Sequence, residues 1–452
     1  MRRFVLPFVL LLNACVPVTP GDTPSRALPQ TSDLPPMKTF GPPRPAAPIK
    51  SNNDLALDFI ELSFQLESGR DLPIFTRFEG PISVRVTGEP PASLGGDLRR
   101  LMHRLQTEAG IDIYEAAPGN PANITIEAVS RAEIRRALPH AACFVVPNIT
   151  TIREYKPNRR STRTSWSALR KREKLAIFLP NDASPQEVRD CLHEELAQAI
   201  GPLNDLYRLP DSVFNDDNVH TVLTGFDMMM LKAYYAPELR SGMTRGQVAQ
   251  MLPMIFERIN PDGEALPAKF ATRTPRAWSE AVQTALGPGA NANQRRIAAA
   301  RALEISEAMG WRDHRRAFAH YANGRLLMSS DPKAAQTHFR AADQFYAATP
   351  GATLHRAYVA TQLAAYAITR GDGDAAMVIL SRHIDEAAQN ENAALLSTLL
   401  LLRAEALDLQ GRTAEARTVR LDSLGWARYG FGSDWAVRAK LREISSLSPL
   451  KG

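Results

Sequence analysis

The stretch from residue 184 to residue 205, SPQEVRDCLHEELAQAIGPLND, carries the strongest structural signal in the chain. Ser184 is followed at once by proline and three residues later by Glu187, an order typical of a capped helix N-terminus. Gly201 and the proline after it end the expected helix. The apolar side chains between these ends recur at helical spacing, at Val188, Leu192, Leu196 and Ala199.

A second face of this expected helix is polar. It carries Cys191, Glu194, Glu195 and Gln198, which helical spacing brings close together. Two carboxyl groups and an amide therefore converge beside a cysteine. Burying a charged group on a helix face costs free energy unless the group is paired, and such groups are often kept at functional sites. This face is therefore the first candidate for a site.

The sequence around this helix, from residue 52 to about 260, predicts mixed α and β structure. Apolar residues recur at helical spacing from Leu55 to Leu66 and again from Leu94 to Leu105, before and after the first predicted strand. Short β-type runs are bounded by Pro, Gly or Asn. The five predicted strands are Ile82–Val86, Ile111–Tyr114, Asn123–Glu127, Ala142–Val146 and Lys174–Leu179.

From about residue 290 to 450 the chain becomes rich in Ala and Leu, with helical periodicity and no strand signals. Turn sequences recur about every 40 residues, at 330–332, 371–373 and 410–412. The spacing of Ala335, Phe339 and Ala342 resembles the second helix of a tetratricopeptide repeat (TPR). We therefore expect a TPR-like helical array that binds a protein or peptide partner, with an irregular helical bundle as the alternative.

The quoted stretch resembles the zinc motif H-E-x-x-H-x-x-G-x-x-H of the metzincins, with every histidine replaced. The resemblance implies an α+β, zincin-like (metzincin-like) domain with a twisted sheet over residues 51–265. It places Glu195 at the general-base position. The metal positions fall on Glu194, Gln198 and Asn204, with Asp205 as a near alternative.

The chain also resembles a bacterial family catalogued as domain of unknown function 2927, whose members look exported or lipid-anchored. The hallmark of that family is a Cys-Leu-x-Glu-Glu-Leu-x-Gln-Ala-Leu-Gly segment, with Asn-Asp and Phe-Asn-Asp after it. This sequence matches the hallmark at Cys191, Leu192, Glu194, Glu195, Leu196, Gln198, Ala199, Gly201, Asn204, Asp205, Phe214, Asn215 and Asp216, with Ile200 in place of Leu. The family has no established activity, so the resemblance implies a fold and no reaction.

Ligand chemistry argues against a zinc enzyme. Zinc is normally held by imidazole or thiolate, and an amide oxygen is a weak donor. Without a metal to acidify water, Glu195 has no activated nucleophile to deprotonate. We therefore expect no cofactor and no catalysis. A Ca²⁺ ion held by Glu194, Asp205, Asp216 and Asp217, or a metal-dependent peptidase or glycan hydrolase with Glu195 as base, is the alternative. His193 points away from this face in the chosen register and is expected at the surface.

The N-terminus predicts export. Two arginines precede an apolar run from Phe4 to Leu12 that is far too short to span a bilayer, and no later segment qualifies. Leu12 to Cys15 resembles the lipobox of bacterial lipoproteins. Residues 1–14 are then a signal peptide and Cys15 the lipidated residue, anchored in the cell envelope. Val16, in place of Asp, favours the outer membrane, facing the periplasm.

Three further expectations follow from composition. Residues 15–50, which hold ten of the 33 prolines, are expected to form an extended tether. Cys143 and Cys191 are expected to pair in the oxidising envelope, with two free thiols as the alternative. The net charge of +6 over 452 residues is too small to imply nucleic acid.

One loop is strongly basic. Residues 153–174 contain nine Lys or Arg and two Glu, together with two aromatic residues. Such a loop either grips an anionic ligand such as a lipid headgroup or is merely solvated. The candidate ligand-binding residues are Arg159, Arg160, Arg163, Trp166, Arg170 and Lys171.

Overall fold

The computed structural model describes residues 32–451, apart from residues 42, 44 and 118. From Leu34 onward the chain forms one compact unit. The expected signal peptide and Cys15 lie outside the described residues. Within residues 32–451, with those three gaps, no helix combines the length and the apolar character needed to cross a bilayer.

A five-stranded sheet forms the centre of the first region. Its strands are β1 (Ile82–Gly88), β2 (Ile113–Glu115), β3 (Ile124–Val129), β4 (Phe144–Pro147) and β5 (Leu175–Pro180), in the order β2-β1-β3-β5-β4. All neighbours pair in parallel except β4, which runs antiparallel to β5. All five predicted strands are confirmed. The mostly parallel pairing makes this an α/β region rather than the α+β domain we expected, because parallel neighbours need helical crossovers.

Helices cover both faces of the sheet. Alternate residues of β5 point to opposite faces, Ile177 into one core and Phe178 into another. The first core is closed by α2 (Leu94–Ala109) and α5 (Pro185–Ile200), the second by α3 (Arg131–Ala137) and α4 (Ile152–Asn158). Burial on both faces explains why all six residues of β5 are buried.

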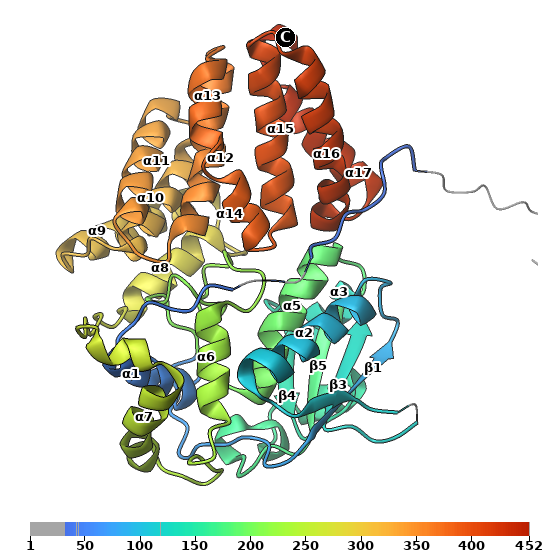
Figure 1. Ribbon diagram of the computed structural model, residues 1–452, viewed down its shortest axis with the longest axis vertical. Coiled ribbons are helices and arrows are strands. Elements are labelled where there is room, and N and C mark those ends of the chain that lie inside the picture. The colour runs from blue at the N-terminus through green and yellow to red at the C-terminus, as the bar shows by residue number, and fades with distance from the viewer. Residues whose placement is uncertain (1–31, 42, 44, 118, 452) are drawn as a thin grey trace, which may run out of the picture. The chain divides into compact units, whose positions relative to one another are not determined.

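Three more helices extend the first core beyond the sheet. They are α1 (Asn52–Ser63), α6 (Gly225–Tyr234) and α7 (Arg245–Ile259). In Figure 1, α1 lies next to α7, and α6 packs against α2 and α7. We call α5 the motif helix, since it carries the expected site residues Glu194 and Glu195. The loop from residue 201 to residue 224 joins it to α6.

The second region is helical and has its own apolar cores. Successive helices pack against one another (Figure 1), and each predicted turn joins two helices that are in contact. The region is therefore helical, as predicted. Its helices are α8 (Arg276–Leu286), α9 (Ala292–Ala308), α10 (His314–Leu327), α11 (Pro332–Ala347), α12 (Thr353–Thr369), α13 (Gly373–Leu380), α14 (Ile384–Gln389), α15 (Ala393–Leu409), α16 (Thr413–Phe431) and α17 (Asp434–Ser445).

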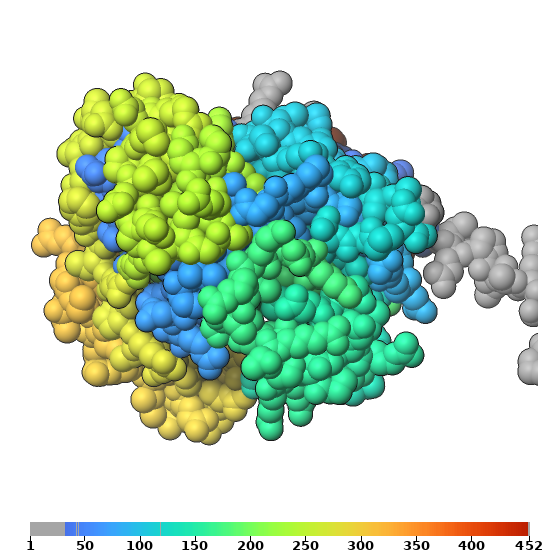
Figure 2. Space-filling model, turned by 90° about the horizontal axis from the view of Figure 1, so that it is seen from below, coloured from blue at the N-terminus to red at the C-terminus, as the bar shows by residue number. Residues whose placement is uncertain are grey.

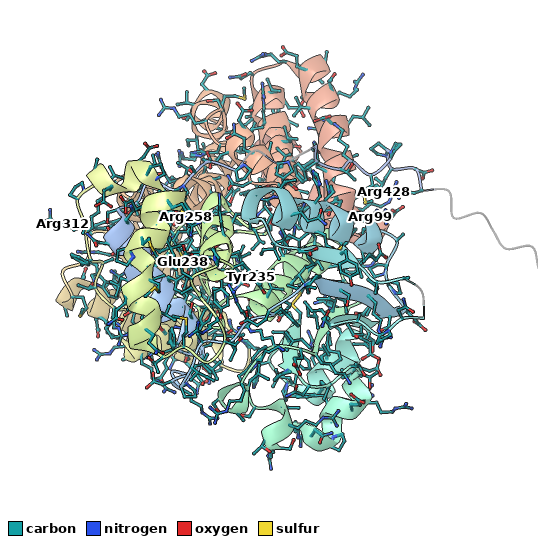
Figure 3. All side chains as sticks on the ribbon, turned by 60° about the horizontal axis from the view of Figure 1, so that its bottom comes forward. Arg99, Tyr235, Glu238, Arg258, Arg312 and Arg428 are labelled. Carbon is teal, nitrogen blue, oxygen red and sulfur yellow. A yellow bond between two sulfur atoms is a disulfide. The ribbon has the colours of Figure 1, made fainter. Side chains whose placement is uncertain are left out.

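The described residues of 34–50 do not behave as a free tether. We call them the strap. Phe40 stacks on Trp426 of α16 with the ring centroids 4.5 Å apart, and the Lys38 backbone N–H donates to the Gly425 carbonyl oxygen at 3.0 Å. Arg428, labelled in Figure 3, donates to the Pro35 carbonyl oxygen at 3.0 Å. The tether expectation is wrong for these residues because one aromatic side chain and a few backbone contacts suffice to dock a segment that has no core of its own.

Candidate functional site

The motif helix α5 forms as its sequence predicts. The Ser184 side chain accepts a hydrogen bond from the Glu187 backbone N–H at 3.2 Å, and the helix ends before Gly201. At that end the buried Arg172 donates to the Gln198 carbonyl oxygen at 2.7 Å and to the Gly201 carbonyl oxygen at 2.6 Å. A cation near the last carbonyls of a helix stabilises that end, so Arg172 has a structural role.

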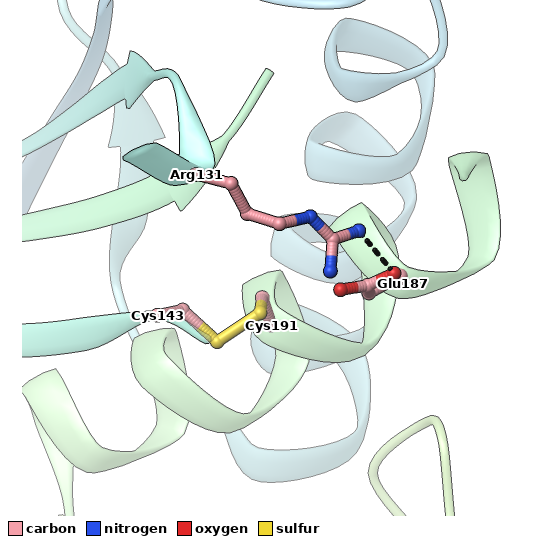
Figure 4. Close-up of a disulfide and its surroundings, with 4 residues drawn as sticks. All are labelled: Arg131, Cys143, Glu187 and Cys191. Atoms are coloured by element: carbon pink, nitrogen blue, oxygen red, sulfur yellow. Dashed lines mark hydrogen bonds and ion pairs between the residues drawn. A yellow bond between two sulfur atoms is a disulfide. The ribbon is translucent and has the colours of Figure 1, made fainter. Parts of the chain in front are cut away.

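A disulfide fixes α5 to the sheet, which confirms the predicted pairing. Cys143, just before β4, bonds to Cys191, with the two Cα atoms 5.9 Å apart. Beside it Arg131 of α3 forms an ion pair with Glu187 at 2.7 Å (Figure 4). The covalent bond links the middle of the motif helix to the sheet edge and so limits its movement.

Glu195, the residue at the general-base position, is buried. Its side chain is 5% exposed, and its Oε2 atom has no hydrogen-bond partner among the described residues. Burial, together with the neighbouring Glu194 and Glu67, raises the pKa of Glu195 well above its usual range. This shift favours the neutral form of Glu195, and a protonated carboxyl group cannot accept a proton as a general base.

Glu195 belongs to a group of five acids, which we call the acidic cluster. Burial and the charges of Glu67 and Asp216 raise the pKa of Glu194 to about 7. Burial and the other members raise the pKa of Asp205 well above its usual range. The cluster consists of Glu67 in the turn after α1, Glu194 and Glu195 on α5, and Asp205 and Asp216 in the loop between α5 and α6.

The expected metal ligands do not form one ligand set. Asn204 donates from Nδ2 to the Glu61 carbonyl oxygen at 3.0 Å, which turns its side chain toward α1. Gln198 donates from Nε2 to Glu67 at 3.3 Å. Among the residues that the structure describes, no three His, Cys, Asp or Glu side chains are arranged to hold a metal ion.

The proposed calcium ligands Asp216 and Asp217 are engaged elsewhere. Asp216 accepts hydrogen bonds from the Tyr207 hydroxyl at 2.9 Å and from Gln283 of α8 at 3.0 Å. Asp217 contacts His355 Nε2 of α12 at 2.8 Å, and both side chains are buried. The loop after α5 is thus tied to the helical region.

His193 is not at the surface, so that prediction was wrong. The side chain is 5% exposed, and its Nδ1 atom accepts a hydrogen bond from the Leu223 backbone N–H at 3.1 Å. Burial, with nearby arginines, lowers the pKa of His193 well below its usual range and keeps the ring neutral. His193 is buried because α5 packs against the sheet on one side and against α16 of the helical region on another, which leaves little exposed face.

The similarity of the chain to a known family falls on this part of the fold. Residues 52–254 match the family model DUF2927, described as a protein of unknown function. No curated protein and no solved structure matches the chain. The DUF2927 segment runs from the start of α1 into α7, so it contains the sheet, the motif helix and the whole acidic cluster.

The basic loop of the DUF2927 segment is exposed. Arg159, Arg160 and Arg170 are exposed. The part of the chain that contains this loop is green in Figure 2. Arg163 contacts Glu154 at 3.7 Å, and Lys171 contacts Glu173 at 3.0 Å. Trp166 is half-buried beneath the guanidinium of Arg172, 5.3 Å from its ring centroid. The side chains of Arg159, Arg160 and Arg170 are thus accessible to an anion, whereas Arg163 and Lys171 are paired and Trp166 packs against the fold.

A cavity of about 730 Å³ was not predicted from the sequence. It lies where the DUF2927 segment, the helical region and the strap meet, and it is lined by residues from 43–58, 208–226, 266–271, 312–314 and 348–390. A volume of this size is within the range of small-molecule sites, and domain junctions are common places for them. No motif could have indicated it, because its walls come from segments far apart in the chain.

Proposed function

We propose that this chain is a lipoprotein of the bacterial cell envelope that binds a protein partner and has no catalytic activity. In this proposal the lipid on Cys15 holds it to the outer membrane, facing the periplasm. Its DUF2927 segment is a degenerate zincin-like domain, and its helical region is a TPR-like scaffold. The observation that carries the proposal is the burial of Glu195, whose Oε2 atom has no hydrogen-bond partner among the described residues and whose pKa is raised well above its usual range.

The surroundings of Glu195 favour this function over a metal-dependent hydrolase. A zincin base must be ionised and must reach the metal-bound water. Gln198 and Asn204, at two of the metal positions, already donate hydrogen bonds to Glu67 and to the backbone of α1. We therefore assign the acidic cluster no role in hydrolysis and expect no bound cofactor.

Binding through the helical region is supported by exposed apolar side chains. Val378 on α13 is 64% exposed, Leu421 on α16 is 60% exposed, and Trp435 on α17 is 74% exposed. Exposed aromatic residues are frequent anchors of protein interfaces. Trp435 is the side chain we expect to contribute most to a protein interface.

Export is supported by the disulfide between Cys143 and Cys191. Disulfides persist in oxidising compartments such as the periplasm and are rare in the cytosol. Metabolic labelling with a palmitate analogue tests the anchor. The wild-type chain should be labelled and a Cys15→Ser variant should not, whereas equal labelling of both would exclude Cys15 as the lipidated residue.

Metal content tests the lack of catalysis. The chain carrying Cys15→Ser is purified without chelators from cells supplied with zinc, and bound metal is measured by mass spectrometry. We expect less than one metal ion per chain and no effect of Glu194→Ala. A stoichiometric ion that disappears in the Glu194→Ala variant would overturn the non-catalytic assignment.

Site-specific photo-crosslinking in cells tests the binding role. A photoreactive residue at position 435 should give a defined crosslinked protein, whereas the same residue at Lys333, exposed on α11, should not. No product from position 435, or the same products from both positions, would count against the helical region as the binding surface.

A further inference from the structure

The cavity at the junction has a largely apolar wall. The strap contributes prolines and Ile49, which is 86% exposed, and the DUF2927 segment contributes Val222, Leu223 and Phe226. An apolar cavity of about 730 Å³ favours an apolar ligand body, because each buried CH₂ group contributes about 0.8 kcal/mol.

Three of the five cations that line the cavity are already neutralised. Lys50 pairs with Asp58 at 2.8 Å, and Arg208 pairs with Asp58 and, at 2.8 Å, with Glu61. Arg104 pairs with Glu108 at 2.7 Å. These groups hold the walls together and have little charge left for a ligand.

The acids of the lining are also mostly engaged. Asp54 accepts hydrogen bonds from the backbone N–H groups of Lys269 and Phe270, Asp313 pairs with Arg315 at 2.6 Å, and Glu386 accepts from Thr353 at 2.6 Å. Asp211 is the exception, since its Oδ1 atom is buried and has no partner within the described part of the chain. The lining therefore offers a ligand few free carboxylates.

Two cations of the lining remain unpaired within the described residues, Lys269 and Arg312, and both are exposed. They come from segments that are tied together, because Trp311 donates to the Thr272 hydroxyl at 3.0 Å and Arg315 to the Thr272 carbonyl oxygen at 2.7 Å. Figure 3 shows Arg312 at the margin of the molecule. Lys269 and Arg312 thus lie at the rim of the cavity.

An apolar chamber with two free cations at its rim is complementary to an amphiphile with an anionic end. We propose that the junction cavity binds one anionic amphiphile, with its apolar body against the strap and α6 and its carboxylate or phosphate at Lys269 and Arg312. This inference goes beyond the proposed scaffold role. It assigns the strap a purpose, which is to form one wall of a lipid-type site.

The experiment measures binding of 11-(dansylamino)undecanoic acid, a fluorescent anionic amphiphile, to the full chain carrying Cys15→Ser. We expect one saturable site, from which dodecanoate or dodecyl phosphate displaces the probe. Dodecyltrimethylammonium, with the same tail and a positive head, should displace it at least about tenfold less well. Stronger displacement by dodecanoate would identify a fatty acid as the ligand. Stronger displacement by dodecyl phosphate would identify a phospholipid-like headgroup. Absence of saturable binding, or equal displacement by the cationic amphiphile, would overturn the proposal.

Variants locate the site. Lys269→Ala with Arg312→Ala should weaken binding of the probe about tenfold, since both charge contacts with its anionic end are lost. Ala47→Trp, on the exposed strap, should reduce binding by filling the cavity. The matched pair Lys156→Ala with Arg159→Ala, exposed on the basic loop, should change nothing. An equal loss in the matched pair would move the site to the basic loop and overturn the assignment.

Discussion

Arg189 on the motif helix forms a buried ion pair with Glu391 of the helical region, with Nη1 3.0 Å from Oε2 and side-chain exposures of 1% and 9%. The same guanidinium also donates to the Glu391 carbonyl oxygen. One turn earlier, Gln186 accepts from the Ala394 backbone N–H at 2.9 Å. The motif helix therefore also contacts the helical region directly.

This ion pair predicts a large loss of stability in a single variant. Arg189→Met leaves Glu391 buried without its partner, which should lower the free energy of unfolding by about 3–5 kcal/mol. Adding Glu391→Gln removes the stranded charge and should recover part of the loss. Urea unfolding at pH 7 measures both variants. A double variant less stable than Arg189→Met would show that Glu391 contributes through other contacts.

The disulfide should contribute strongly to stability. It closes a sequence separation of 48 residues, and the chain-entropy model gives a stabilisation of about 4 kcal/mol for a loop of that length. Replacing both Cys143 and Cys191 by Ser should lower the urea midpoint accordingly. The reduced wild-type chain should have the same urea midpoint as the double variant. A midpoint equal to that of the oxidised wild-type chain, in either case, would contradict the prediction.

The acidic cluster predicts a pH-dependent stability. Burial and neighbouring acids raise the pKa of Glu194 from 4.5 to about 7. Below pH 4.5 Glu194 is protonated in the folded and unfolded chains alike, and the stability that it contributes is lost as the pH rises through about 7. Glu194→Gln should therefore stabilise the fold at pH 8, by about 3 kcal/mol, and leave it almost unchanged at pH 4.5.

Unfolding in urea at the two pH values tests this prediction. The control is Glu173→Gln, which removes an exposed carboxylate. This variant should not alter how the free energy of unfolding depends on pH. Equal effects of Glu194→Gln at both pH values would mean that the cluster does not disfavour the charged form of Glu194.

The strap should be released by a single substitution. Phe40→Ala removes the stack on Trp426 and should weaken docking by about 1–2 kcal/mol, since the side chain is half-buried. Trypsin should then cut after Lys38 and Lys50 faster than in the wild-type chain. Met37→Ala, at an exposed neighbouring position, should leave the cleavage rate unchanged. Unchanged cleavage in Phe40→Ala would show that other contacts hold the strap.

Local patterns predicted much of the fold. Each of the five strands was bounded by turn-forming residues, and Ser184 and Gly201 marked the ends of α5, so short-range chemistry was sufficient there. The pairing of Cys143 with Cys191 followed from the compartment and from the count of cysteines.

Long-range packing was not predictable. Nothing near His193 in the sequence shows that Leu223 covers it, and the partner of Arg189 lies 202 residues away. Of the candidate residues found from one motif, Glu194, Glu195 and Asp205 belong to the acidic cluster, whereas the side chain of Asn204 turns toward α1. Glu67 was missed, because it has no motif and joins the acidic cluster only through the turn after α1.

The protonation state of Glu195 tests the central claim most directly. The infrared difference spectrum between the wild-type chain and Glu195→Gln at pH 7 isolates the vibrations of this one side chain. We predict the carbonyl band of a protonated carboxyl group that is absent from the variant. A carboxylate band in its place would mean that Glu195 is ionised and able to act as a base, and it would contradict the account.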